Sequence, residues 1–205
     1  MTVPHEEALR TGAREILGRP LTAAEFDSMS KYLKLLVKWQ KVQRLIGSSG
    51  PGSIVDDLIL DSLLFVRVLP SRVKRVMDLG SGAGLPGIPL SIVLPSVHLI
   101  LVEAKQKRAS FLSTAVRELG LRSTRVINSR AEDLLPEYER IFDAVVMRCA
   151  GPLAQMLPLA ARFVVAGGSV IASGPPEPSH LHEGVWTNVA RPGRDGDRLF
   201  AVVGK

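Results

Sequence analysis

Cysteine and histidine are scarce in this sequence. Cys149 is the only cysteine among 205 residues, so the chain can form neither an internal disulfide nor a cysteine-based zinc site, and a reducing compartment is the simpler interpretation. Only two of the four histidines, His180 and His182, are near neighbours, and their spacing is poor for a metal ligand pair. We therefore expect no metal ion.

Long apolar runs are also missing. The longest, Ile88 to Leu94 and Val97 to Val102, fall well short of the roughly 20 residues that a membrane span needs. Residues Met1 to Gly12 include two glutamates, a histidine and a proline, where a secretory signal would carry a basic region and then an apolar run. We expect no membrane association and a cytoplasmic location.

Basic residues outnumber acidic ones. The 26 lysines and arginines exceed the 20 aspartates and glutamates, which gives a net charge of +6 and a pI near 9.8. Such a balance attracts polyanions through phosphate neutralisation, whatever their sequence, and makes RNA or DNA a plausible partner. Many small enzymes are basic for solubility alone, and composition does not separate the two interpretations.

The first third of the chain is predicted to be helical, and we expect residues 1–70 to form an extension to the domain that follows. One helix should run from Thr22 to about Leu45, with Thr22 as N-cap, Glu25 completing a capping box and Leu21 packing on Phe26. The arc that would face a core holds Phe26, Met29, Tyr32, Leu33, Leu36 and Trp39. A second apolar helix is predicted from Ile54 to Leu69.

A basic stripe lies on the opposite arc of the first predicted helix. It consists of Lys31, Lys34, Lys38 and Lys41. An ordinary solvated helix face is the alternative to a surface that follows phosphates. Further candidates for contact with a nucleic acid are Arg44, Arg72, Lys74, Lys105, Lys107 and Arg108.

From Arg75 onward, short strands alternate with helices. Strands are predicted at 76–79, 97–103, 125–129, 142–147, 168–173 and 198–203, and helices from Pro86, at 105–119 and at 152–163. Pro86 is expected as the first helical residue, where its missing N–H costs nothing. This order predicts one α/β domain, residues 71–205, in which helices cover both faces of a parallel sheet. Such sheets bind ligands beyond the carboxyl ends of their strands.

The strand ends therefore hold the candidate site residues. The first predicted strand runs through Asp78 into a turn where Gly80, Gly82 and Gly84 let the backbone bend tightly and approach a bulky ligand. Glu103, 23 residues after Gly80, ends the next strand, where its carboxylate would accept hydrogen bonds from both hydroxyls of a ribose. Together these features indicate a nucleoside-binding site.

Two kinds of nucleoside fit this pattern. Residues 82–87 satisfy G-x-G-x-x-G literally, as in dinucleotide-binding folds. However, the carboxylate of Asp78 suits the ammonium or sulfonium side of S-adenosylmethionine and would repel a pyrophosphate. Pro86 also removes an N–H that a helix start would offer to a phosphate. S-adenosylmethionine is therefore favoured, and a dinucleotide stays open as the cofactor of an oxidoreductase.

The turn and its flanks resemble the ribosomal RNA small subunit methyltransferase G family, also called glucose-inhibited division protein B. The resemblance covers roughly Leu21 to Lys205, and its most specific part is MDLGSGAGLPGIPL at residues 77–90. Supporting matches are Leu33 with Trp39, Ile59-Leu60-Asp61-Ser62, Lys107-Arg108 with Phe111-Leu112, Ser129-Arg130-Ala131-Glu132, and Arg148.

The resemblance implies a Rossmann-like, S-adenosylmethionine-dependent methyltransferase fold with a mostly parallel, seven-stranded sheet. It implies methyl transfer to N7 of a guanine in small-subunit (16S) ribosomal RNA, either as naked RNA or within the assembled subunit, and we expect a monomer. Gly80 and Leu85 would contact the cofactor, and Ala131 and Glu132 would flank its adenine. Arg148 would lie beside the methyl donor as the catalytic candidate, and an ion pair at the sheet end is its alternative role.

Three departures from the family pattern bear on the target. The family has Asn-Leu-Thr where this chain has Arg44-Leu45-Ile46, a histidine where Leu58 stands, and a lysine where Ser173 stands. All three lie outside the glycine turn, so they leave the cofactor prediction intact and put the RNA target in question. The hypotheses are a guanine-N7 methyltransferase, a methyl-donor-binding protein with an altered or lost target, and an NAD(P)-dependent oxidoreductase.

Overall fold

The computed structural model describes residues 3–43, 45–47, 52, 54–148, 151–174, 181 and 183–204. The N-terminal part holds α1 (Val3–Leu17), α2 (Ala23–Gln40), a π-helix η1 (Ile54–Leu60), α4 (Asp61–Leu63) and a 3₁₀ helix η2 (Leu64–Arg67). Within the described residues, none of the helices has both the length and the apolar character needed to cross a membrane.

The start of α2 confirms the predicted capping box. The Thr22 hydroxyl accepts a hydrogen bond from the Glu25 N–H, and the Glu25 carboxylate accepts one from the Thr22 N–H. The helix ends at Gln40 rather than near Leu45. The chain turns there because the Gln40 side chain binds the backbone of Leu45 and Ile46.

A seven-stranded sheet with the order β3-β2-β1-β4-β5-β7-β6 forms the centre of the protein. Its strands are β1 (Arg75–Leu79), β2 (His98–Val102), β3 (Thr124–Ile127), β4 (Phe142–Arg148), β5 (Val164–Ser173), β6 (Val185–Ala190) and β7 (Asp197–Gly204). The first five strands pair in parallel, whereas β7 pairs antiparallel with both β5 and β6. The expected fold class and seven-stranded, mostly parallel sheet are confirmed.

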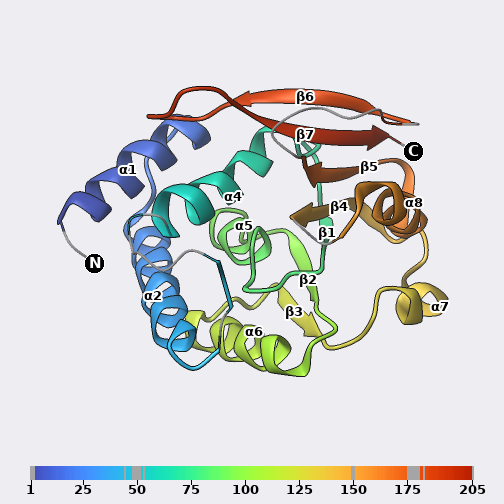
Figure 1. Ribbon diagram of the computed structural model, residues 1–205, viewed down its shortest axis with the longest axis horizontal. Helices are drawn as coiled ribbons and strands as arrows, with labels where there is room; N and C mark the ends of the chain where they lie inside the picture. Colours follow the sequence, from blue (N-terminus) through green and yellow to red (C-terminus); the bar gives the residue numbers. More distant parts are fainter. Residues whose placement is uncertain are drawn as a thin grey trace.

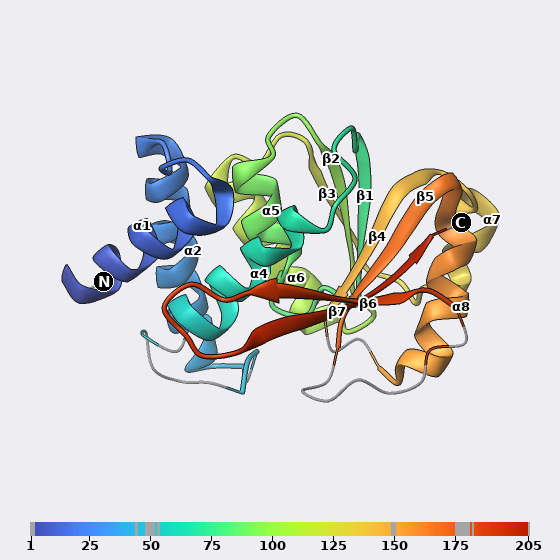
Figure 2. The same cartoon turned by 90° about the horizontal axis from the view of Figure 1, so that it is seen from above.

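Helices cover both faces of the sheet, as Figures 1 and 2 show. The elements α1, α2, α4, α5 (Gly87–Val93) and α6 (Gln106–Leu119) lie on one face. On the other face lie α7 (Leu135–Tyr138), which follows the short 3₁₀ helix η3 (Glu132–Leu134), and α8 (Leu153–Phe163). Pro86 is the N-cap of α5 rather than its first residue.

Alternate residues of the strands divide the core into two clusters, because successive strand residues point to opposite faces. Val76 and Val146 pack with the N-terminal helices, whereas Met77 and Met147 pack with α7 and α8. The first cluster also includes Tyr32 and other residues before position 70, so one core continues across the boundary expected at residue 70. That division into extension and domain stays a prediction.

Candidate functional site

The glycine turn lies at the carboxyl end of β1, where it is tied to the neighbouring strand. The N–H groups of Gly80 and Ser81 both donate to the carbonyl of Val102, the last residue of β2, at 3.0 and 2.9 Å. Gly80, Gly82 and Gly84 have positive φ angles of 73°, 58° and 91°, which residues with a side chain rarely adopt. The three glycines thus allow the chain to reverse here beside the end of β2.

Tight packing beneath the turn excludes side chains at Gly84 and at Gly87, the first residue of α5. A Cβ on Gly84 would lie 2.5 Å from Cδ1 of Ile88, and one on Gly87 would lie 2.2 Å from Cδ2 of Leu101. A Cβ on Gly82 would meet nothing closer than 3.8 Å. The turn at Gly82 therefore leaves space for a ligand, whereas neighbouring core side chains leave no space for a Cβ at Gly84 or Gly87.

Asp78 is fully buried under this turn, on the face of the sheet that α5 covers. One carboxylate oxygen, Oδ2, accepts a hydrogen bond from the N–H of Gly87 at 2.9 Å, and the other, Oδ1, has no partner. Burial raises the pKa of Asp78 to about 7, and the nearby carboxylate of Glu103 adds to the effect. A cationic group beside Oδ1 would relieve this unpaired buried atom.

Glu103 connects the turn to the next helix. Its Oε2 accepts a hydrogen bond from the N–H of Gly82 at 2.9 Å, and its Oε1 accepts one from the N–H of Lys105 at 2.8 Å. Asn128, beyond β3, donates to the Glu103 carbonyl at 2.8 Å and so fixes the ends of β2 and β3 together. Each carboxylate oxygen keeps a lone pair that can accept a further hydrogen bond from a ligand.

The other predicted cofactor contacts come from two different settings. Leu85 is buried in the core beside the turn. Ala131 is the N-cap of η3 and packs partly against the core, whereas Glu132 is exposed on that helix. Ala131 and Glu132 lie beyond the end of β3, at the same edge of the sheet as the glycine turn.

Arg148 ends β4 and contacts the N-terminal helices. Its guanidinium donates to the carbonyls of Asp57 and Leu58 at 2.6 and 3.1 Å, and it forms an ion pair with the buried carboxylate of Asp61 at 3.4 Å. Its side chain is 14% exposed. The structure thus contains the ion pair at the sheet end that the sequence left as the alternative role, and a contact with the methyl donor stays a prediction.

Two of the three departures from the family pattern lie near Arg148. Leu58 supplies the carbonyl that Arg148 contacts. Ser173, at the end of β5, accepts a hydrogen bond from Arg198 of β7, and Arg198 also pairs with Asp61 at 3.4 Å. Nothing in the sequence singles out Arg198, because only the antiparallel course of β7 brings it to this edge of the sheet. Arg44, the third departure, lies outside the described residues.

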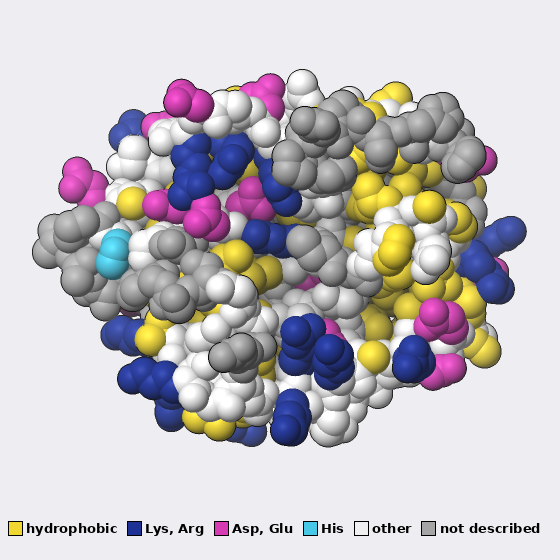
Figure 3. All heavy atoms as spheres, in the orientation of Figure 1, with side chains coloured by type: hydrophobic (Ala, Val, Ile, Leu, Met, Phe, Trp, Pro, Cys, Tyr) yellow, Lys and Arg dark blue, Asp and Glu magenta, His cyan; other side chains and the backbone are white. Residues whose placement is uncertain are grey.

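Six of the predicted RNA-contacting lysines are exposed at two neighbouring helices. Lys31, Lys34, Lys38 and Lys41 are exposed along α2, and Lys105 and Lys107 are exposed at the start of α6. Trp39 of α2 packs edge-to-face on Phe111 of α6, so these two basic segments are neighbours, and Figure 3 shows lysine and arginine side chains over both helices. Arg108 is half-buried, with a guanidinium nitrogen 4.0 Å from the Cβ position of Gly82.

Arg72 and Lys74 do not join these lysines. They precede β1, so they lie at the amino ends of the parallel strands, opposite the edge that holds the glycine turn.

Within the described residues, no three histidine, aspartate or glutamate side chains come together in a way that would hold a metal ion. Cys149, His180 and His182 lie outside those residues.

Tyr32 contacts the glycine turn, although the sequence predicts only that its side chain is buried in the core. Tyr32 was expected on the apolar arc of α2, and it is fully buried there. Its hydroxyl also donates to the carbonyl of Ala83, within the glycine turn, at 2.7 Å. A buried tyrosine usually finds a hydrogen-bond partner, but the sequence does not reveal which.

Solved structures share this fold. A methyltransferase from Geobacter sulfurreducens aligns over 85% of this chain and 89% of its own, with a TM-score of 0.59 and 13% sequence identity. A precorrin-6y C5,15-methyltransferase from Geobacter metallireducens aligns over 78% and 90% of the two chains, with a TM-score of 0.51 and 14% identity. At these identities the likeness establishes the fold alone.

Sequence comparison is more specific. Residues 25–174 match the family model described as GidB, rRNA small subunit methyltransferase G. The ribosomal RNA small subunit methyltransferase G of Azoarcus sp. is 36% identical over 198 residues, covering 92% of both chains. The protein of that name from Xanthomonas oryzae pv. oryzae is 35% identical over 98% of this chain and 99% of its own. The chain therefore belongs to the rRNA small subunit methyltransferase G family.

Proposed function

We propose that this protein transfers the methyl group of S-adenosylmethionine to N7 of a guanine in small-subunit ribosomal RNA. The observation that carries the proposal is the family match over residues 25–174, which includes the glycine turn, Glu103 and Arg148. Family membership also argues against a nicotinamide-dependent oxidoreductase. A sheet whose β7 runs antiparallel between β5 and β6 differs from the dinucleotide-binding order as well.

The residues around the turn suit S-adenosylmethionine. Oδ1 of Asp78 is buried and unpaired, so the ammonium or sulfonium side of the cofactor would supply the missing partner. The open side of Gly82 would admit the nucleoside, and Glu103 would accept hydrogen bonds from its ribose. Gly80 and Leu85 would contact the cofactor, with Ala131 and Glu132 beside its adenine. When bound, the cofactor supplies an electrophilic methyl group.

The reaction needs alignment rather than a general base. Guanine N7 carries an in-plane lone pair and has no proton to lose, so the protein has only to hold it in line with the methyl group. Arg148 would hold the guanine through O6, or hold the adjoining phosphate. The carbonyls of Asp57 and Leu58 fix its guanidinium in place, which is the kind of preorganisation that such a role requires.

The RNA would bind across α2 and α6. The lysines on the outer face of α2 and at the start of α6 are exposed on these two neighbouring helices, and they would neutralise phosphates without reading sequence. We infer that the partner is small-subunit ribosomal RNA or the assembled subunit, that the protein acts as a monomer, and that it acts in the cytoplasm, where this substrate occurs.

A second candidate function is binding of the methyl donor with an altered or lost target. Leu58 and Ser173 favour it, because neither offers the ionisable side chain that the resemblance leads us to expect. Ser173 is instead engaged by Arg198. These changes lie beside Arg148 and outside the glycine turn.

Restoration of the modification in cells tests the proposal. The chain would be expressed in bacteria that lack their own family enzyme, and 7-methylguanosine in small-subunit RNA would be measured by nuclease digestion and mass spectrometry. The proposal predicts that the modified nucleoside returns with the unaltered chain and not with Arg148→Ala. If the nucleoside is absent from these cells although the purified protein binds S-adenosylmethionine, the altered-target candidate is favoured.

A further inference from the structure

The N-terminal helix α2 contributes a side chain to the glycine turn. Tyr32 is fully buried, and its hydroxyl donates to the carbonyl of Ala83 at 2.7 Å across 51 residues of sequence. Burial raises the pKa of the Tyr32 hydroxyl well above its usual value, so it stays a hydrogen-bond donor throughout the working pH range.

This contact fixes one peptide group from both sides. The carbonyl of Ala83 accepts from Tyr32, while the N–H of the same peptide group, on Gly84, donates to the Ser81 carbonyl at 2.7 Å. The peptide group lies between Gly82 and Gly84, whose φ angles of 58° and 91° are both in the left-handed region. Glycines have many accessible conformations, so an external contact is needed to select one of them.

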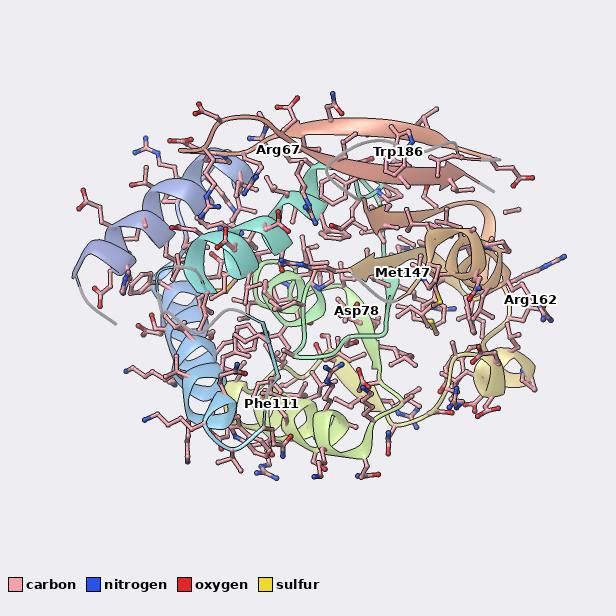
Figure 4. The ribbon with its side chains drawn as sticks, in the orientation of Figure 1. Arg67, Asp78, Phe111, Met147, Arg162 and Trp186 are labelled. Atoms are coloured by element: carbon pink, nitrogen blue, oxygen red, sulfur yellow. The ribbon has the colours of Figure 1, made fainter. Side chains whose placement is uncertain are left out.

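Neighbouring contacts hold α2 in register with the turn. Trp39 packs on Phe111 of α6 with ring centroids 5.4 Å apart. Figure 4 labels Phe111, and it labels Asp78 nearer the centre of the molecule. Helix α6 begins directly after Lys105, whose N–H binds Glu103. Helix α2 therefore contacts the turn through Tyr32 and the helix that follows Glu103 through Trp39.

We propose that Tyr32 is a positioning residue for the methyl donor, which holds the Ala83–Gly84 peptide group in the conformation that binds the cofactor. The inference rests on the proposed cofactor site at the glycine turn. It assigns part of that site to the helix whose outer face carries Lys31, Lys34 and Lys38, so the extension supports cofactor binding as well as the proposed contact with RNA.

The test compares Tyr32→Phe with Ser30→Ala. Each variant removes one hydroxyl from α2 that donates to a backbone carbonyl, but the Ser30 hydroxyl binds Phe26 within the same helix. Calorimetry with S-adenosylmethionine should give a dissociation constant about threefold to tenfold higher for Tyr32→Phe, the range expected for one buried hydrogen bond, and an unchanged value for Ser30→Ala. In methyl transfer, KM for the donor should rise and kcat should not.

Hydrogen exchange supplies a readout that does not depend on the cofactor. The amides of Gly84 and Leu85, which both donate to the Ser81 carbonyl, should exchange about threefold to tenfold faster in Tyr32→Phe than in Ser30→Ala. Equal affinity and equal exchange in the two variants would overturn the role of Tyr32. If the unaltered protein fails to bind S-adenosylmethionine, the cofactor proposal itself fails, and faster exchange would still show that Tyr32 holds the turn.

Discussion

Replacing Asp78 by asparagine should change how the stability of the protein depends on pH. The substitution keeps an oxygen that can accept from the Gly87 N–H and removes a carboxylate that is fully buried. Burial raises the pKa of Asp78 from its ordinary value of 3.8 to about 7 in the folded protein. The unfolded chain therefore releases this proton at a much lower pH than the folded protein does.

The sign and size of the effect follow from proton linkage. Because the folded pKa of Asp78 is the higher one, the stability contributed by its proton is fully present below pH 3.8 and is lost as the pH rises through about 7. Between about pH 5.5 and about pH 8.5 the loss amounts to on the order of 2 kcal/mol. Asp78→Asn has no such proton, so its stability relative to the unaltered protein should rise by that amount.

Urea unfolding of both proteins at the two pH values, without cofactor, measures this change. The difference between the variants cancels every other titrating group, and any fixed cost of the asparagine amide is the same at both pH values. A stability difference that stays constant within about 0.5 kcal/mol, a realistic error for such a comparison, would refute the reasoning.

Three further predictions concern the same turn and Arg148. A bound cation favours ionised Asp78, so the dissociation constant for S-adenosylmethionine, measured by calorimetry, should fall by up to about tenfold per pH unit from about pH 5.5 towards the Asp78 pKa of about 7. The dissociation constant of Asp78→Asn should show no such dependence on pH. Gly84→Ala should lower the free energy of unfolding by about 1–3 kcal/mol more than Gly120→Ala, because both glycines have positive φ but only a Cβ at Gly84 would lie 2.5 Å from Ile88. Equal losses of stability for the two variants in urea unfolding would contradict this prediction. Arg148→Ala should lower kcat for methyl transfer about 100-fold while the cofactor still binds in calorimetry, and near-normal turnover would remove Arg148 from the site.

Local sequence signals predicted much of the fold. The capping box at Thr22 is confirmed because both of its hydrogen bonds form within one turn of chain. The strands predicted at 76–79 and 97–103 are confirmed, the second as His98–Val102, because apolar runs that stop at glycine or an acid mark buried parallel strands. These features depend on residues close together in the sequence.

Other elements were missed for reasons that are equally physical. β6 (Val185–Ala190) is an edge strand with only Val189 fully buried, so its sequence lacks an apolar alternation. The first third of the chain was predicted to be helical, but no bounds were given for α1, although Leu9, Ala13 and Ile16 follow a helical period and are buried. The strand order predicted parallel pairing and gave no sign that β7 returns antiparallel.

The candidate site follows the same division. The glycine turn and Glu103 were predicted, because one strand–turn–helix–strand unit contains them. The partners of Arg148 were not, since Asp57 and Leu58 are 91 and 90 residues away in the sequence. Tyr32 has a local signal for burial alone, because its hydrogen bond to Ala83 arises only when α2 packs against the turn.

Methyl transfer by the purified protein tests the central claim most directly. The protein would be incubated with methyl-labelled S-adenosylmethionine and small ribosomal subunits from cells that lack the family enzyme, and the RNA would then be digested to nucleosides. The account predicts that the label appears in 7-methylguanosine and that Arg148→Ala lowers its rate of appearance about 100-fold. Label in another nucleoside, or no label from a protein that binds the cofactor, would contradict the account.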